Sequence, residues 1–316
     1  MQNLLKKIQE NIFRHELLER GNKIIVGISG GPDSVCLLDI FSKLQKNYGL
    51  ELVVAHVNYG LRGKDSEKDE KLVKKLAEKY KLPCEVFQIS NFKFQISENN
   101  LRDIRYKFFE KISKKHGSDR LALAHNRNDQ AETVMLRLLR GSGLRGLGAM
   151  KFRNENIIRP LLNISRKEIL EYLRKNRIPY RTDKSNLKND FTRNKVRNQL
   201  FPFIEKNFNP NFQEALFHLA AASNEDYGFI RRYAEEWLGK KKNIPVKEIG
   251  NLHPAIRNEV LRQAIGRELG NLQEVENSHL DEILKILKST KNKRQKLSFK
   301  GLKIERIGDK LVISKL

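Results

Sequence analysis

The strongest constraint on the fold is a short segment in which an apolar strand runs through a glycine-rich turn directly into a helix. Residues 24–28 are largely apolar and β-branched, residues 29–34 read S-G-G-P-D-S, and an apolar helical stretch begins at Val35. Adjacent glycines let backbone N–H groups approach an anion, and the start of the helix turns its positive dipole end to the same place. We therefore predict a phosphate-binding turn formed by Ser29, Gly30, Gly31, Pro32, Asp33 and Ser34.

This turn differs from the two commoner phosphate loops. The Walker pattern ends in Gly-Lys-Ser/Thr, which the turn lacks, and the dinucleotide pattern G-x-G-x-x-G is absent from it. A G-x-G-x-x-G does occur at residues 141–146, but it follows a predicted helix rather than a strand. We interpret residues 140–148 as a loop that places Arg140 and Arg145 near the phosphate site.

Strand and helix patterns alternate up to about residue 160, which predicts an α/β fold with a parallel sheet covered by helices on both faces. Further strands are expected at 52–57, 84–89, 121–124 and 157–158. A helix over 66–80 is expected to start with a Ser66–Asp69 capping box, and a later helix with a Ser165–Glu168 box. Ligands of such sheets bind beyond the carboxyl ends of the strands, so Ser29, His56 and His125 are expected to share one cleft.

The pattern changes in the last third of the chain. The pattern over about residues 210–290 predicts helices throughout, and residues 304–307 and 310–313 flank Gly308-Asp309, a two-residue hairpin signal. We predict a catalytic domain over 1–215 and, after a helical linker, a small α+β domain over 216–316 that ends in a short β-hairpin.

Charge and cysteine content limit the classes of function that this chain could have. Lys and Arg number 62 against 38 Asp and Glu, a net charge of +24, which suits a polyanionic partner such as a nucleic acid. The alternative is that these lysines are merely solvated. The two cysteines, Cys36 and Cys84, form no metal-binding spacing. With no signal peptide and no long apolar run, we expect a cytoplasmic protein without a membrane partner.

Three more groups of residues are candidates for catalytic or binding roles. His56 lies at the end of the second predicted strand, and Arg62 follows that strand. Asp129 and Glu132 lie three residues apart in the first turn of a helix, where acids either complement the helix dipole or hold Mg²⁺. Arg193 and Arg197, spaced i and i+4, project from one helix face and are either solvated or bracket a substrate.

These motifs together resemble one family. The chain contains, in order, S-G-G-P-D-S, H-V-N-Y-G-L-R, A-H-N-x-N-D-Q-A-E-T, R-G-S-G-L-x-G-L, R-P-L-L, D-x-S-N and R-N-x-V-R-N. Over residues 20–200 it is similar to the tRNA(Ile)-lysidine synthetases, which belong to the PP-loop ATP pyrophosphatases. The resemblance implies an adenine-nucleotide alpha-hydrolase-like fold, and ATP- and Mg²⁺-dependent ligation of L-lysine to C2 of the wobble cytidine of tRNA(Ile) with a CAU anticodon, through an adenylated cytidine.

The same resemblance suggests roles for single residues. The turn residues, with His56 and Arg62, are expected to bind the nucleotide, Asp33 and Asp129 the magnesium, and Glu132 or Asp129 the lysine. The catalytic residues are expected to be Asp33, His125, Asp129 and Arg193. Contacts with tRNA are assigned to the basic residues Arg140, Arg145, Arg193, Arg197, Lys291, Lys293 and Arg294.

Other functions and assemblies stay open at this point. A PP-loop tRNA thiolase would be equally basic, but it needs catalytic or cluster-binding cysteines. A small-molecule adenylating synthetase would share the loop but would not need the charge. A non-enzymatic RNA-binding protein fits the charge and leaves the loop unexplained. The sequence leaves open whether the chain forms a homodimer.

Overall fold

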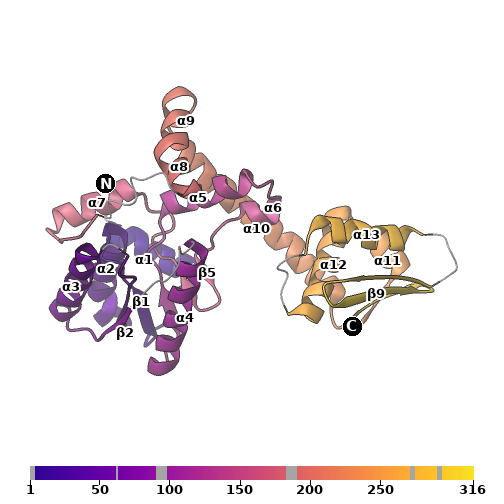
Figure 1. Cartoon of the computed structure of the whole chain (residues 1–316), viewed down its shortest axis with the longest axis horizontal. Helices are drawn as coiled ribbons and strands as arrows, with labels where there is room; N and C mark the ends of the chain where they lie inside the picture. The colour runs from indigo at the N-terminus through magenta and orange to yellow at the C-terminus, as the bar shows by residue number, and fades with distance from the viewer. Residues whose placement is uncertain (1–3, 62, 90–97, 183–190, 271–274, 290–293) are drawn as a thin grey trace. The chain divides into compact units, whose positions relative to one another are not determined.

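The chain folds into two compact units, Met1–Ala222 and Ser223–Leu316, each with its own hydrophobic core. The computed structural model describes residues 4–61, 63–89, 98–182, 191–270, 275–289 and 294–316 (Figure 1). Within these ranges, every helix is too short or too polar to cross a lipid bilayer.

The first unit is built on a six-stranded sheet in the order β3-β2-β1-β4-β6-β5. All neighbouring strands pair in parallel except β5 and β6, which pair antiparallel at one edge. This confirms the predicted parallel sheet and each predicted strand. The strands are β1 Lys23–Gly27, β2 Glu51–Asn58, β3 Cys84–Gln88, β4 Arg120–Ala122, β5 Arg153–Asn154 and β6 Ile157–Ile158.

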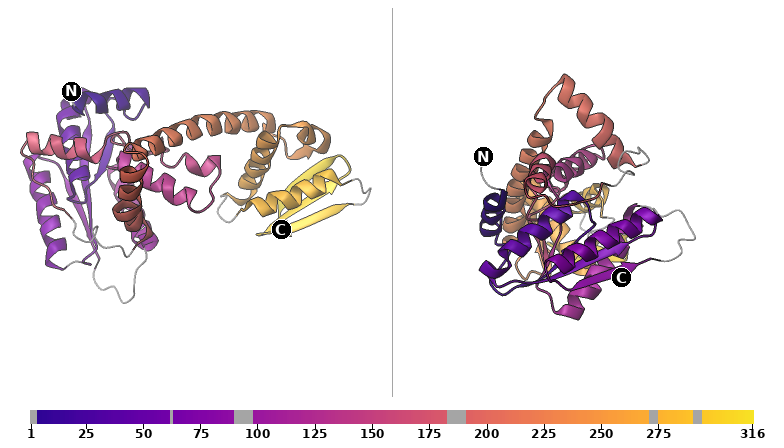
Figure 2. Two further views of the ribbon diagram at one scale, coloured as in Figure 1. Left: turned by 90° about the horizontal axis from the view of Figure 1, so that it is seen from above. Right: turned by 90° about the vertical axis from the view of Figure 1, so that its left-hand side faces the viewer.

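Helices cover both faces of this sheet (Figure 2). Successive residues of a strand point to opposite faces. Ile24 and Val26 accordingly pack with α1 Leu4–Arg14, α2 Pro32–Tyr48, α3 Lys64–Lys79 and α7 Arg166–Lys175. Ile25 instead packs with Phe108 and Phe109 of α4 Glu98–His116 on the other face. The near-continuous apolar runs of the strands are therefore explained by burial on both sides.

Of the two capping boxes expected in this unit, one forms and one does not. Ser165 and Glu168 form the predicted box at the start of α7. The Ser66–Asp69 box was wrong, because α3 already begins at Lys64 after Gly63 and both residues lie inside the helix. The Asp69 carboxylate accepts a hydrogen bond from Arg181 instead.

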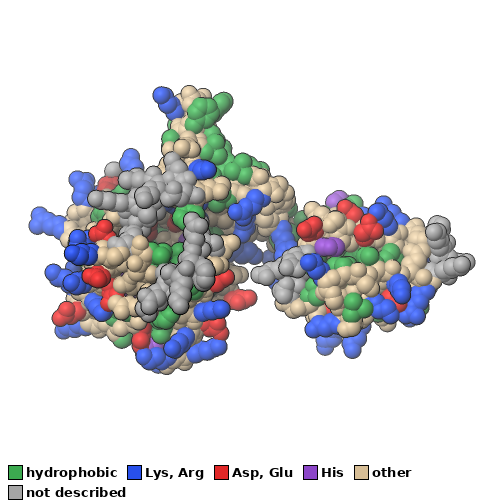
Figure 3. All heavy atoms as spheres, in the orientation of Figure 1, with side chains coloured by type: hydrophobic (Ala, Val, Ile, Leu, Met, Phe, Trp, Pro, Cys, Tyr) green, Lys and Arg blue, Asp and Glu red, His purple; other side chains and the backbone are tan. Residues whose placement is uncertain are grey.

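The rest of the first unit is a group of helices after the sheet. They pack around Val134, Val196, Phe201 and Leu216. Side chains that this core leaves exposed include Phe203 and Phe208, and Figure 3 shows hydrophobic side chains gathered over α8 and α9. The elements are α5 Arg127–Leu138, α6 Leu144–Leu147, α8 Thr192–Lys195, the π-helical turn η2 Val196–Leu200, α9 Phe201–Asn207 and the first part of α10 Phe212–Leu238.

The second unit is α+β, as expected, but the expectation of helices throughout 210–290 was wrong, because a short strand at 243–245 pairs with the last strand of the chain. Its antiparallel sheet has the order β7-β10-β9-β8, and Gly308 and Asp309 join β9 to β10. The division between the units falls within α10, as does the boundary expected after residue 215. The elements are β7 Asn243–Pro245, α11 Val246–Asn251, α12 Pro254–Leu269, α13 Asn277–Lys288, β8 Gln295–Phe299, β9 Leu302–Ile307 and β10 Lys310–Lys315.

Candidate nucleotide site

The glycine-rich turn lies between the end of β1 and the start of α2, and its own side chains hold its shape. Ser34 Oγ donates to the Gly31 carbonyl at 3.0 Å and accepts from the Ser29 N–H at 3.1 Å. Gly30 has φ +87°, a conformation that favours glycine. Pro32, with no N–H, occupies the first turn of α2, where the remaining N–H groups have no partner within the helix. The turn is therefore pre-organised to receive an anion.

A cavity of about 370 Å³ opens beside this turn, at the carboxyl ends of the strands. A larger groove of about 700 Å³ lies between α4 and β6, but it has no phosphate loop, so the chemistry favours the smaller cavity. The polar residues that line the smaller cavity are Ser29, Asp33, Ser34, Tyr59, Arg105, His125, Asp129, Arg166 and Arg197.

Asp33 is the most perturbed carboxylate of the cavity. Its Oδ2 accepts a hydrogen bond from Arg166 Nη1 at 2.7 Å, while Oδ1 is buried without a hydrogen-bond partner among the described residues. Burial raises the pKa of Asp33 to about 6, because the lowering effect of Arg166 offsets burial only in part and the Asp129 charge adds to the increase. Arg166 therefore compensates the cost of burying the ionised Asp33 carboxylate only in part.

These observations fit a divalent cation. A buried carboxylate oxygen without a partner, close enough to a second carboxylate to feel its charge, is a suitable ligand for Mg²⁺. In the described part of the chain no group of three or more His, Cys, Asp or Glu side chains could form a complete metal site. A cation here would therefore need phosphate or water oxygens as further ligands.

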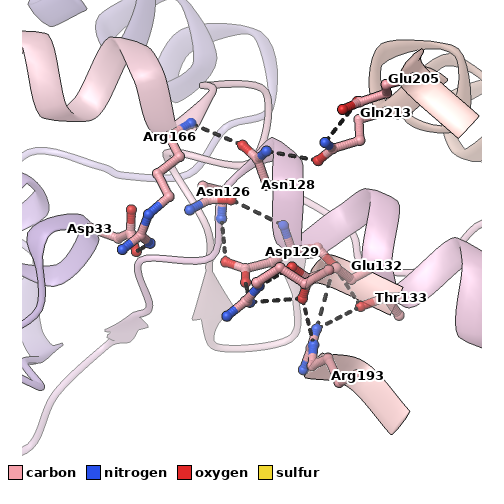
Figure 4. A network of polar contacts seen from close by, with 11 residues as sticks. Asp33, Asn126, Asn128, Asp129, Glu132, Thr133, Arg166, Arg193, Glu205 and Gln213 are labelled. Atoms are coloured by element: carbon pink, nitrogen blue, oxygen red, sulfur yellow. Dashed lines mark hydrogen bonds and ion pairs between the residues drawn. The ribbon is translucent and has the colours of Figure 1, made fainter. Parts of the chain in front are cut away.

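Asp129 is held at the start of α5 by a reciprocal capping box. Its Oδ2 accepts from the Asn126 N–H at 3.0 Å, and the Asn126 side chain accepts from the Asp129 N–H at 3.0 Å (Figure 4). Its Oδ1 lies 3.6 Å from Arg197 Nη2. Asp129 thus complements the helix dipole and also faces the cavity, and its role as a ligand of Mg²⁺ stays a prediction.

Glu132, one turn further along α5, is paired with two arginines. Its side chain is only 2% exposed, and both carboxylate oxygens are occupied. Arg193 Nε donates to Oε2 at 2.8 Å, and Arg197 donates to Oε1 at 2.5 Å and to Oε2 at 2.9 Å. The predicted Arg193–Arg197 pair therefore does project from one helical face, but onto Glu132. A carboxylate already neutralised by two arginines is a poor receptor for a lysine ammonium.

His125 is a neutral hydrogen-bond donor in this setting. Arg159 Nε lies 3.2 Å from His125 Nδ1, and a guanidinium only donates, so Nδ1 accepts and the imidazole proton lies on Nε2. Burial, and then the charges of Arg159 and other arginines, lower the pKa of His125 well below its usual value. His125 can therefore donate a proton to a hydrogen bond but does not carry a charge at neutral pH.

The remaining predicted residues lie outside the cavity or outside the described residues. His56 is buried with Nδ1 2.8 Å from the Ile28 carbonyl, so it supports the backbone before the turn. Arg140 and Arg145 are exposed near the end of α5 and on α6, and neither lines the cavity. Arg294 pairs with Glu305 at 2.8 Å. Arg62, Lys291 and Lys293 lie outside the described residues.

Sequence reasoning missed two arginines that contact the site. Arg166 reaches Asp33 from the first turn of α7. The Arg181 N–H donates to the Gly30 carbonyl at 3.0 Å, and its side chain binds Asp65 and Asp69 of α3. Both residues lie more than 130 positions from the turn in the sequence, so no local sequence pattern connected them with it.

Comparisons with known proteins agree with this geometry. The PP-loop domain family matches residues 1–204. Two tRNA(Ile)-lysidine synthases are similar over nearly the whole chain: that of Clostridium tetani is 36% identical over 96% of this chain and 67% of its own length, and that of Clostridioides difficile is 34% identical over 98% and 70%. This chain thus spans about two thirds of their length.

The fold is also found in a solved structure, a U34-tRNA thiolase from Methanococcus maripaludis with its [4Fe-4S] cluster. It matches with a TM-score of 0.58 and 20% identity over 70% of this chain and 77% of the thiolase. At this identity the likeness supports the fold alone. The family matches and the phosphate-loop cavity lead to one assignment: the chain belongs to the tRNA(Ile)-lysidine synthase family of ATP-dependent PP-loop ligases.

Proposed function

We propose that the protein uses ATP to activate the wobble cytidine of tRNA(Ile) with a CAU anticodon and then joins L-lysine to it. O2 of the cytosine attacks the α-phosphate and pyrophosphate leaves. The ε-amine of lysine then attacks C2, loses a proton, and AMP departs with O2. The observation that carries this proposal is the pre-organised Ser29–Ser34 turn, which opens onto a cavity containing Asp33, Asp129 and His125.

The contacts suggest how this chain's residues divide the work. The turn N–H groups and the start of α2 would bind the phosphates. Asp33 would hold Mg²⁺ together with phosphate oxygens, and the ion would supply charge neutralisation at the phosphates. His125 would donate its Nε2 proton in a hydrogen bond to the negative charge that develops on the activated base or phosphate.

The contacts of Glu132 and Asp129 indicate which of the two carboxylates could bind the ammonium group of the lysine substrate. Because Glu132 is saturated by Arg193 and Arg197, Asp129 is the better candidate for the lysine ammonium. Glu132 would then fix the two arginines at the edge of the site. The Asp129 carboxylate lines the cavity, where it could form a charge-assisted hydrogen bond with the ammonium group of a cationic amino acid.

The alternative of a thiolase is disfavoured by the cysteines. The protein has only two, too few for the ligands of a cluster. Cys36 is buried and burial raises its pKa far above the usual value, while the pKa of the half-buried Cys84 is raised as well. Thiolates are the reactive form, so neither residue is suited to sulfur transfer.

ATP–pyrophosphate exchange tests the proposal. Exchange should require a tRNA with cytidine at the wobble position, and Asp33→Ala should abolish it while leaving tRNA affinity nearly intact. Equal loss of exchange and of tRNA binding would instead indicate a folding defect. Exchange with a free small acceptor in place of tRNA would exclude the proposed function.

A further inference from the structure

Arg166 forms an ion pair with a residue of the phosphate turn itself. Its Nη1 lies 2.7 Å from Asp33 Oδ2, with a side-chain exposure of 40% for the arginine and 21% for the aspartate. Both residues line the cavity beside the turn. A strong, charge-assisted contact is thus made at the place where the proposed nucleotide would bring its phosphates.

The backbone of Arg166 is fixed, while its guanidinium reaches across to α2. The Ser165–Glu168 capping box starts α7, and the Arg166 N–H donates to Asn128 Oδ1 at 2.9 Å. Asn128 in turn donates to Gln213 Oε1 at 2.7 Å (Figure 4). The partly exposed side chain can therefore change its partner without moving the helix that carries it.

Two other arginines near the turn, Arg197 and Arg181, are bound to carboxylates outside it. Arg197 lines the cavity but is bound to Glu132 through Nε and Nη2, and Arg181 is bound to Asp65 and Asp69. Arg166, in contrast, is paired with the carboxylate that would have to bind a cation. A guanidinium on Asp33 Oδ2 and a divalent cation on the unpartnered Oδ1 would lie close enough to repel each other, which favours release of the guanidinium when the cation binds.

We propose that Arg166 is the resting counter-ion of Asp33 and transfers to the triphosphate when the nucleotide and its cation bind. The inference rests on the proposed ATP-binding function of the turn. In the free protein the guanidinium neutralises Asp33 in place of a metal ion. When a cation takes Asp33, the released guanidinium contacts the phosphate oxygens and positions them against the turn.

If Arg166 changes partner in this way, replacing it should change two binding constants in opposite directions. In Arg166→Ala, Mg²⁺ with a non-hydrolysable ATP analogue should bind about 10- to 100-fold more weakly, as expected for a lost hydrogen bond to a charged group. Mn²⁺ alone, with no nucleotide present, should bind about two- to fivefold more tightly, because a partly exposed competing ion pair is gone. Arg166→Lys keeps the charge without the planar guanidinium and should fall between.

Calorimetry for the analogue and electron paramagnetic resonance for Mn²⁺ measure the two constants on the full chain. Arg174→Ala, which removes an exposed arginine from the same helix, is the matched control and should change neither. Analogue and Mn²⁺ affinities that weaken together would show a merely structural role and overturn the inference. If wild-type protein binds the analogue and Arg166→Ala binds it equally tightly, the inference alone fails. If the wild type binds no analogue, the proposed function fails and the inference with it.

Discussion

Glu132 is a buried carboxylate whose ion pairs fix two arginines near the cavity. Its contacts with Arg193 and Arg197 hold both arginines beside the cavity. Removal of one member of a buried ion pair leaves the other charges without compensation. Glu132→Gln should therefore lower the free energy of unfolding by about 3 kcal/mol. The measurement is urea unfolding at pH 7.

The lysine dependence of the same variant separates this role from direct lysine binding. A supporting residue should lower stability, with the KM for lysine and the KM for ATP changing by similar factors. A selective rise in the lysine KM at unchanged stability would restore Glu132 as the lysine receptor. Glu110→Gln is the control, because it breaks only an exposed i,i+4 pair with Lys114 and should change stability little.

At the scale of residues, the sequence predicted the parts of the site that depend on local geometry. Asp33 lies within the turn, and His125 and Asp129 follow directly after a strand, so the topology alone brings them to one cavity. The partners of Asp33 and Glu132 could not be predicted in this way. Arg166 is separated from Asp33 by 133 positions and Arg197 from Glu132 by 65, and charge complementarity over such distances leaves no periodic signal.

At the scale of elements, α7 connects the N-terminal helix to the phosphate turn. Glu168 of α7 accepts a hydrogen bond from Lys7 of α1 at 2.6 Å, and Arg166 of the same turn reaches Asp33. Burial alone would raise the pKa of Glu168, but the hydrogen bonds from Lys7 and Ser165 outweigh it and lower the pKa to about 2. The ionised form of Glu168 is therefore stabilised more in the folded protein than in the unfolded chain.

A pH dependence follows from this lowered pKa. The unfolded value is 4.5, so the stabilisation is fully present above pH 4.5 and is lost as the pH falls towards 2. Glutamine keeps the capping geometry but not the charge. Glu168→Gln should lower the free energy of unfolding at pH 7 by about 1–2 kcal/mol, less than the roughly 3 kcal/mol that the pKa difference implies, because the carboxylate is 29% exposed.

Urea unfolding between pH 7 and pH 3 measures this dependence. The difference between wild type and Glu168→Gln should shrink as the pH falls below 4.5. Glu171→Gln, on the same helix, removes a more exposed pair with Lys175 and should have a smaller effect. A difference that stays constant with pH would mean that the Glu168 charge does not contribute.

The two capping boxes show where element prediction succeeds and fails. Ser165 comes directly before the first residue of α7, so it acts as the N-cap and the box forms as predicted. At Ser66 the same spacing was misleading, because Gly63 lets the chain turn into α3 earlier. Asp69 was then available to Arg181, whose backbone also binds the Gly30 carbonyl of the turn. The carboxylate that the local motif would have used as a cap is thus engaged in a long-range contact.

At the scale of the whole molecule, charge is the property that the phosphate site does not explain. A net charge of +24 exceeds what a nucleotide and a lysine require, and it suits a tRNA as the proposed partner. Positive side chains occur on the visible faces of both units (Figure 3). We therefore expect tRNA affinity to fall steeply with salt, with contributions from the second unit.

The basic residues directly before β8 provide the most specific test of this expectation in the second unit. Replacement of Lys291, Lys293 and Arg294 by glutamine should weaken tRNA binding and reduce the slope of log affinity against log salt by about 2–3, at ~0.7–0.9 for each lost phosphate contact. Arg294 is paired with Glu305, but its side chain is 60% exposed, so it can still reach a phosphate. Filter binding across a salt series measures the slope. The matched variant, with both lysines replaced by arginine and Arg294 by lysine, keeps the charge and should keep the slope. An unchanged slope in the glutamine variant would remove these residues from the tRNA interface and assign the salt dependence to the remaining cations.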